Sequence, residues 1–149
     1  MTPKPSIAQL EQSLTEDFDL LENWEEKYEY LVELGQEMPK MDPALKTEDR
    51  LVKGCQSSVW FDIHCEKGIM RFSADSDSLV VKGMVAVLDQ LLNDQPAADV
   101  LKTDLSFFER LGLWHHISSQ RSNGLTAMMG HLKQAAVECL AQSEVPDGA

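Results

Sequence analysis

The sequence predicts an α+β fold in which helices at both ends of the chain pack on a short antiparallel sheet of about three strands. Three observations predict it. Helical periodicity occupies both ends of the chain, period-two alternation lies between them, and strands do not alternate with helices in a βαβ order. The 149 residues can bury a sizeable core. We therefore expect a single domain over residues 1–149 with its core at about residues 6–142, so that the first few residues and the tail are loose.

Two helices are expected before the sheet, and each begins with a capping pattern. Residues 6–9 (Ser-x-x-Gln) and 23–26 (Asn-x-x-Glu) have the form in which side chains cap free backbone N–H groups. The first helix should run over about residues 6–17. The second shows an apolar face, and Gly35 suits its C-terminal end. Two prolines then predict an irregular connection over residues 38–46.

A hairpin is expected in the middle of the chain. Apolar and polar residues alternate from Val59 to Cys65, which predicts a half-buried strand with Cys65 on its inner face. Glu66-Lys67-Gly68 has the composition of a turn with glycine at positive φ, and residues 69–74 form the return strand. Two strands alone are marginal in water, so a third strand or a covering helix is required.

The next expected helix is residues 79–92, which are apolar on nearly all sides and therefore belong in the core. Residues 75–77 (Asp-Ser-Asp) offer candidates for its N-cap, and Gly83 inside it should permit close packing. Pro96 can open a further short helix, because proline is tolerated in a first turn.

The C-terminal third should contain an amphipathic turn ended by Gly112, a polar bend over residues 118–123, and a long final helix. The apolar face of that helix includes Cys139. The tail after Gln142 is expected to be loose.

Composition narrows the possible partners. The formal net charge is −12, and residues 1–49 alone hold 13 acidic and 4 basic residues. An acidic surface repels phosphate backbones, so we expect no nucleic acid partner. No apolar run approaches the ~20 residues that span a bilayer, and no secretory signal begins the chain, so we expect no membrane association and a cytoplasmic location. Three cysteines without a CxxC pair argue against a disulfide framework.

The strongest candidate for chemistry is Cys55, in the stretch from Glu48 to Trp60. Gly54 lets the backbone turn sharply and leaves its neighbour open to a partner. Lys53 puts a positive charge within reach of the sulfur, and a nearby cation favours the nucleophilic thiolate. A free cysteine is more often a small buried apolar residue, so this plainer interpretation stays open.

Arg121 is a second candidate, just ahead of the predicted final helix. A helix N-terminus carries partial positive charge, and together with Arg121 it could hold an anion or a thiolate. The plainer interpretation is an exposed arginine in a loop.

A metal site is an alternative hypothesis. His64, Cys65, His115, His116 and Cys55 could supply the four nitrogen and sulfur ligands of zinc. Their spacing matches no standard zinc signature, however, and neighbours on a strand point to opposite faces. Neither G-x-S-x-G nor a P-loop glycine pattern is present, which sets aside serine-hydrolase and phosphate-loop chemistry.

Several stretches share the order and spacing of a known family over about residues 20–137. They are Asn23-Trp24-Glu25-Glu26-Lys27-Tyr28, Glu33-Leu34-Gly35, Gly54-Cys55-Gln56-Ser57 with Val59-Trp60, Ala74-Asp75-Ser76-Asp77 with Val80-Val81-Lys82-Gly83, and Arg121-Ser122-Asn123-Gly124-Leu125 with Ala127-Met128. In these stretches the chain resembles the SufE family of sulfur-acceptor proteins. It departs from the family at both ends, and Ser58 stands where a larger polar residue is more frequent.

The resemblance implies a compact α+β fold similar to that of iron–sulfur scaffold proteins. It implies a stoichiometric carrier, not an enzyme, that stimulates a pyridoxal-phosphate cysteine desulfurase and receives its sulfur on Cys55. The carrier then passes sulfur on toward iron–sulfur cluster assembly, with a scaffold protein as a candidate recipient. The cofactor belongs to the desulfurase, and none is expected on this chain. Lys53, Gly54, Gln56 and Arg121 are the expected supporting residues. A non-catalytic interaction domain whose acidic helices dock a partner remains an alternative.

Overall fold

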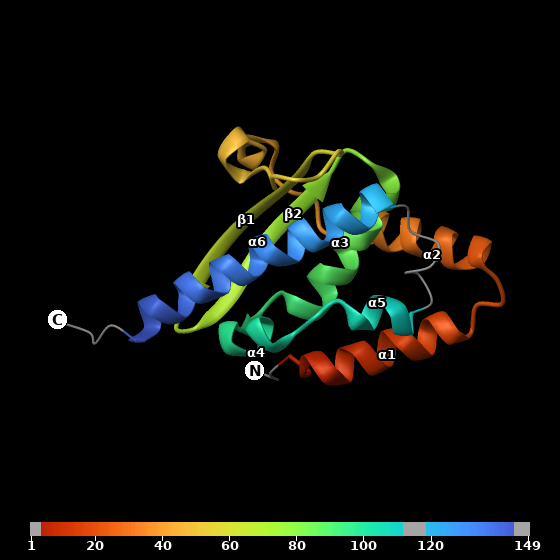
Figure 1. The fold of residues 1–149 in the computed structure, drawn as a ribbon, viewed down its shortest axis with the longest axis horizontal. Coiled ribbons are helices and arrows are strands. Elements are labelled where there is room, and N and C mark those ends of the chain that lie inside the picture. Colours follow the sequence, from red (N-terminus) through yellow and green to blue (C-terminus); the bar gives the residue numbers. More distant parts are fainter. Residues whose placement is uncertain (1–3, 112–118, 145–149) are drawn as a thin grey trace.

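The computed structural model describes residues 4–111 and 119–144, with the backbone alone at 119–122 and 143–144. Helices precede and follow an antiparallel hairpin, which confirms the predicted α+β class (Figure 1). The helices and strands are α1 (Ile7–Asp19), α2 (Trp24–Glu37), β1 (Val59–Glu66), β2 (Ile69–Ser76), α3 (Leu79–Leu92), β3 (Gln95–Pro96), α4 (Ala97–Lys102), α5 (Ser106–Arg110) and α6 (Ser119–Glu144). Two 3₁₀ turns, η1 (Pro43–Leu45) and η2 (Glu48–Arg50), lie between α2 and β1.

Both N-terminal helices begin where their capping patterns predict. The Ser6 side chain accepts a hydrogen bond from the Gln9 backbone N–H, and the Gln9 side chain accepts one from the Ser6 N–H. Asn23 caps α2 by accepting from the Glu26 N–H at 2.9 Å. These bonds satisfy N–H groups that the helices themselves leave free.

Two glycines allow α2 and α3 to approach each other closely. A Cβ atom on Gly83 would lie 2.3 Å from the carbonyl oxygen of Leu31, and one on Gly35 would lie 2.9 Å from the backbone nitrogen of Gly83. The predicted packing role of Gly83 is therefore confirmed. The prediction that Gly35 ends α2 is wrong, because α2 continues to Glu37 and Gly35 serves the helix contact instead.

The sheet has the order β1-β2-β3, with antiparallel pairs throughout. Phe61 on β1 and Met70 and Phe72 on β2 are buried, as the alternation predicts. The required third strand is only Gln95–Pro96, a segment that the sequence did not distinguish from the start of α4. β2 extends to Ser76, so the N-cap predicted within residues 75–77 is wrong, and Ser78 caps α3.

One hydrophobic core joins the sheet to the helices. Figure 1 shows α6 lying along the hairpin, while α3 packs between β2 and α2. The predicted apolar face of α6 is buried from Leu125 to Cys139. The helix begins at Ser119, so the bend predicted over residues 118–123 is wrong from residue 119 on. Polar residues can form the first turns of a helix whose later turns are anchored in a core.

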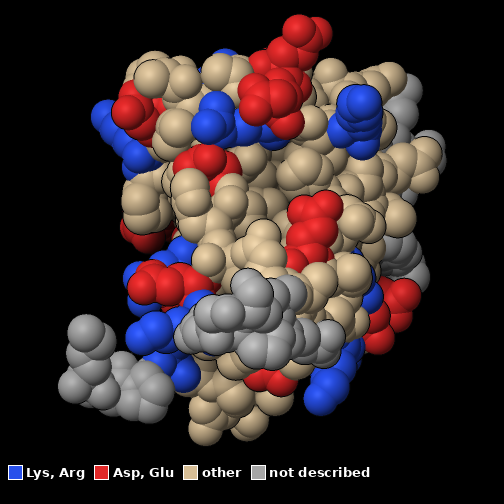
Figure 2. Space-filling view, turned by 90° about the vertical axis from the view of Figure 1, so that its left-hand side faces the viewer, with Lys and Arg blue, Asp and Glu red and all other residues tan. Residues whose placement is uncertain are grey.

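The surface carries charges of both signs. Figure 2 shows acidic and basic side chains interspersed on one end of the molecule, despite the net charge of −12. Among the described residues, no helix is both long enough and apolar enough to span a bilayer.

Candidate functional site

The loop that carries Cys55 connects two paired segments. At its base the Val52 N–H donates to the Val59 carbonyl at 2.8 Å. Ser58 exchanges two hydrogen bonds with Asp77, one through its N–H to the carboxylate at 3.0 Å and one through its carbonyl at 3.2 Å. The base of the loop is therefore fixed to β1 and to the segment between β2 and α3.

The tip of this loop rests on α6. Gly54 has φ +95°, the conformation expected of a glycine turn. The Cys55 thiol donates to the Gly124 carbonyl with Sγ and oxygen 3.4 Å apart, and a Cβ on Gly54 would lie 3.2 Å from the Cβ of Ala127. Cys55 is partly buried and packs against the core. The loop thus holds its cysteine inward against the helix.

Burial raises the pKa of the Cys55 thiol above its ordinary value. The sequence left two interpretations open, a thiolate favoured by Lys53 and a partly buried apolar cysteine, and the second describes the resting state. Lys53 is exposed, and desolvation is what shifts the pKa of the sulfur. At neutral pH the resting cysteine is consequently a protonated and poorly nucleophilic thiol.

The structure brings the other predicted site residues to different places. Gln56 is exposed on the loop. Arg121 lies inside α6, three residues before Gly124, and not ahead of the helix as predicted; its side chain is outside the described part. Sequence reasoning passed over Gly124 and Ala127, the residues that contact the loop tip, although both lie in the stretch that carried the family resemblance.

The proposed metal ligands are not brought together. Cys65 forms a disulfide with Cys139, with Cα atoms 5.5 Å apart, so the expectation of no disulfide is wrong. The two cysteines are 74 residues apart in the sequence, and they become neighbours only because α6 packs on β1. The His64 side chain contacts Asp62 and neither of these cysteines, since its Nε2 lies 2.8 Å from the Asp62 carboxylate. His115 and His116 lie outside the described residues. Within the described chain, no three His, Cys, Asp or Glu residues gather as metal ligands would.

A buried carboxylate fixes the segment that leads into the loop. Asp75, on β2, binds Lys46 at 2.6 Å and Lys82 at 3.2 Å. Lys46 also lies over the ring of Trp60, 5.5 Å from its centroid. Burial alone would raise the pKa of Asp75, but hydrogen bonds from Lys46, the Ser76 backbone and Lys82 outweigh it and lower the pKa.

Replacing Asp75 with Asn should lower the free energy of unfolding at pH 7 by about 1–3 kcal/mol, because two lysines lose their partner. A carboxyl with a lowered pKa stabilises the fold above its unfolded pKa of about 3.9, and this stabilisation is lost as pH falls through the lower folded pKa. The difference between wild type and Asp75→Asn should therefore shrink on acidification below pH ~4. Urea unfolding of wild type and Asp75→Asn, at pH 7 and below pH ~4, measures this difference in the free energy of unfolding. Asp19→Asn, at an exposed position, is the control, and an equal loss there would contradict the assignment.

Comparisons with known proteins identify the family and agree with the fold. The family described as "SufE: Fe-S metabolism associated domain" matches residues 12–136. An uncharacterized SufE-like protein of Rhizobium meliloti is 35% identical over 128 residues, which are 83% of this chain and 91% of the relative. Another from Rhizobium etli is 36% identical over 135 residues, 87% and 90% of the two chains.

A solved structure supports the fold independently. The solution structure of a hypothetical protein from Thermus thermophilus superposes with a TM-score of 0.73 at 24% identity, covering 95% of this chain and 99% of that one. At 24% identity, this similarity is evidence for the fold alone. The family match over most of the chain and the two relatives show that this protein belongs to the SufE family, which is associated with iron–sulfur metabolism.

Proposed function

We propose that this protein accepts sulfur as a persulfide on Cys55 from a pyridoxal-phosphate cysteine desulfurase, stimulates that enzyme, and passes the sulfur on toward iron–sulfur cluster assembly. The observation that carries the proposal is that Cys55 is the single cysteine left with a free thiol. The chain has three cysteines, all in the described part, and the other two are joined to each other. Its place at the tip of a glycine-led loop suits a group that must reach a partner.

The chemistry needs one thiolate and no metal. The Cys55 thiolate attacks the outer sulfur of the persulfide on the desulfurase, a new S–S bond forms, and the cysteine thiolate of the desulfurase leaves. Cys55 must first lose its proton, which is taken up by solvent or by the departing thiolate. The resting site opposes this step, because burial raises the thiol pKa.

Docking must therefore expose Cys55, and the loop is built so that exposure costs little. Its tip is held by one S–H···O bond to Gly124, by the close approach of Gly54 to Ala127, and by the packing of the partly buried Cys55 against the core. A neutral hydrogen bond contributes only about 1 kcal/mol net, and the hydrogen-bonded base of the loop need not move. The inward position also protects the thiol from over-oxidation between transfers. Once the loop has moved, Lys53 and Arg121 are the candidates to stabilise a terminal persulfide anion.

We expect Cys55 in the free protein to react with iodoacetamide more slowly than an unstructured cysteine peptide at the same pH. The midpoint of its rate–pH profile should lie above the ordinary thiol pKa of about 8.5, since burial disfavours the thiolate. Adding a desulfurase whose own active cysteine is replaced by serine should accelerate the labelling. Labelling already as fast as the peptide, and unchanged by the desulfurase, would contradict the protected resting state.

The cytoplasmic location expected from the sequence belongs to this proposal. The Cys65–Cys139 disulfide does not exclude it, although disulfides are rare among reduced cytosolic thiols. Cys139 is only 1% exposed whereas Cys65 is partly exposed, so a reductant can approach the bond only from the Cys65 side.

A further inference from the structure

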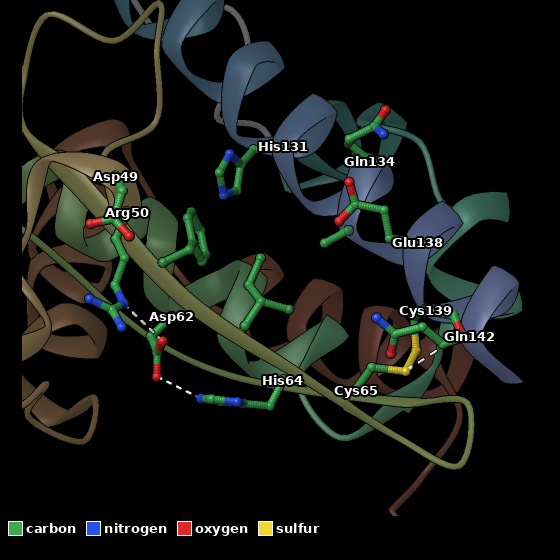
Figure 3. Close-up of a pocket in the computed structure, with 13 residues that line it drawn as sticks. Asp49, Arg50, Asp62, His64, Cys65, His131, Gln134, Glu138, Cys139 and Gln142 are labelled. Carbon is green, nitrogen blue, oxygen red and sulfur yellow. Dashed lines mark hydrogen bonds and ion pairs between the residues drawn. A yellow bond between two sulfur atoms is a disulfide. The ribbon is translucent and has the colours of Figure 1, made fainter.

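A groove of about 600 Å³ lies between β1 and α6, away from the tip of the Cys55 loop. Figure 3 shows His131, Gln134 and Glu138 on α6 on one side and the strand with Asp62 and His64 on the other. Asp49 and Arg50 close one end, and the Cys65–Cys139 disulfide lies at the other.

The strand side of the groove is an unpaired sheet edge. β1 is the outer strand of the sheet. The Val59 carbonyl accepts from Val52 and so points away from β2; by the alternation of antiparallel strands, the N–H and C=O groups of Ile63 and Cys65 point the same way. Beyond the Leu51–Trp60 bridge, no described segment pairs with this edge. A free edge with this geometry is a template for an added strand.

The groove favours positive charge. Of the described residues that line it, three supply carboxylates, Asp49, Asp62 and Glu138, and one supplies a guanidinium, Arg50. Arg50 is already engaged with Asp62 at 2.9 Å. Burial lowers the pKa of His131, which stacks on Phe61, so its imidazole adds no positive charge at neutral pH. The exposed carboxylate of Glu138 forms no ion pair with the described residues.

The groove also leads to the Cys55 loop. A smaller hollow of about 290 Å³ is lined by Lys53 of the loop and by Ala127, which contacts Gly54. It shares Asp49 and His131 with the groove. A chain lying in the groove would therefore approach the loop tip at one end.

We propose that the groove binds an extended segment of the desulfurase, with at least one Lys or Arg side chain, as a strand added to the edge of β1. This inference rests on the proposed function. Main-chain bonds to Ile63 and Cys65 would hold the segment, and Glu138 would bind its cationic side chain. The segment would then align the persulfide of the desulfurase with the Cys55 loop.

Two variants with matched controls test the groove. Glu138→Lys reverses the charge of the free carboxylate, while Glu29→Lys makes the same change on α2. Ile63→Pro removes the outward N–H and spares the bonds to β2; Ile63→Ala loses the same packing but keeps that N–H. The dissociation constant for the pyridoxal-phosphate desulfurase, measured by calorimetry, should rise roughly tenfold or more for Glu138→Lys and Ile63→Pro. The controls should stay within about twofold. Equal effects of variant and control, or no effect, would overturn the proposal.

A small-molecule persulfide separates this inference from the function itself, because it needs no docking. The groove variants should accept sulfur on Cys55 from cysteine persulfide at the wild-type rate, which also shows that they are folded. If wild type takes sulfur from the desulfurase and the groove variants bind that enzyme as tightly as wild type, only the groove proposal fails. If wild type takes no sulfur from the desulfurase, the proposed function is contradicted, and the groove proposal, which rests on it, is contradicted as well.

Discussion

Cys55→Ser should abolish sulfur acceptance and the stimulation of the desulfurase. A serine hydroxyl is nearly isosteric with the thiol but has no accessible anion near neutral pH and forms no persulfide, so the transfer step has no acceptor atom. Alanine release by the desulfurase, followed with cysteine as substrate, should fall to the rate of the desulfurase alone. The fold should be unaffected, because the thiol contributes only one weak bond, to Gly124.

The double variant Cys65→Ser with Cys139→Ser is the control. It removes the disulfide between β1 and α6, which closes a 74-residue separation, and should lower the free energy of unfolding by about 2–5 kcal/mol. It should still accept sulfur at a temperature where it is folded. If Cys55→Ser stimulated the desulfurase fully, the result would contradict the sulfur-carrier hypothesis. It would favour the alternative of a non-catalytic interaction domain, in which the acidic helices alone dock the partner.

Gly83→Ala should be the most damaging single substitution away from the site. Its Cβ would lie 2.3 Å from the Leu31 carbonyl oxygen and 2.7 Å from the Leu31 Cγ, so α2 and α3 must separate. Overpacking of this kind costs about 1–3 kcal/mol and more where backbone must move, so we expect at least about 3 kcal/mol here. Urea unfolding followed by circular dichroism measures the loss.

Gly130→Ala is the matched control, because it makes the same change at a helical glycine on α6 with nothing within 4 Å. There the substitution should leave stability unchanged or raise it by up to about 1 kcal/mol, since alanine favours the helix. Similar losses at both glycines would show that the effect does not come from the α2–α3 contact.

Local pattern was enough to predict most elements of this fold. The two capping sequences place the starts of α1 and α2, and the alternation from Val59 predicts which face of β1 is buried. Long-range contacts account for the errors. Gly35 has the composition of a helix end, but the approach of Gly83 from a helix almost fifty residues away decides its role. The Cys65–Cys139 disulfide likewise depends on how α6 lies on the sheet.

The candidate site shows the same division. Sequence singled out Cys55 and the turn at its glycine, and Gly54 makes that turn with a positive φ. The state of the thiol stayed open in the sequence, because it depends on contact with α6 at Gly124 and not on the neighbouring Lys53. The few residues on either side of a cysteine do not indicate whether a segment that is distant in the sequence will bury it.

The most direct test of the central claim is the intact mass of the protein after incubation with a cysteine desulfurase, pyridoxal phosphate and cysteine. We expect wild type to gain the mass of one sulfur atom, the gain to disappear with a reductant, and peptide mapping to place it on Cys55. Cys55→Ser should gain none. An unmodified wild-type protein beside an active desulfurase, or sulfur found on another residue, would contradict the claim that Cys55 is a persulfide carrier.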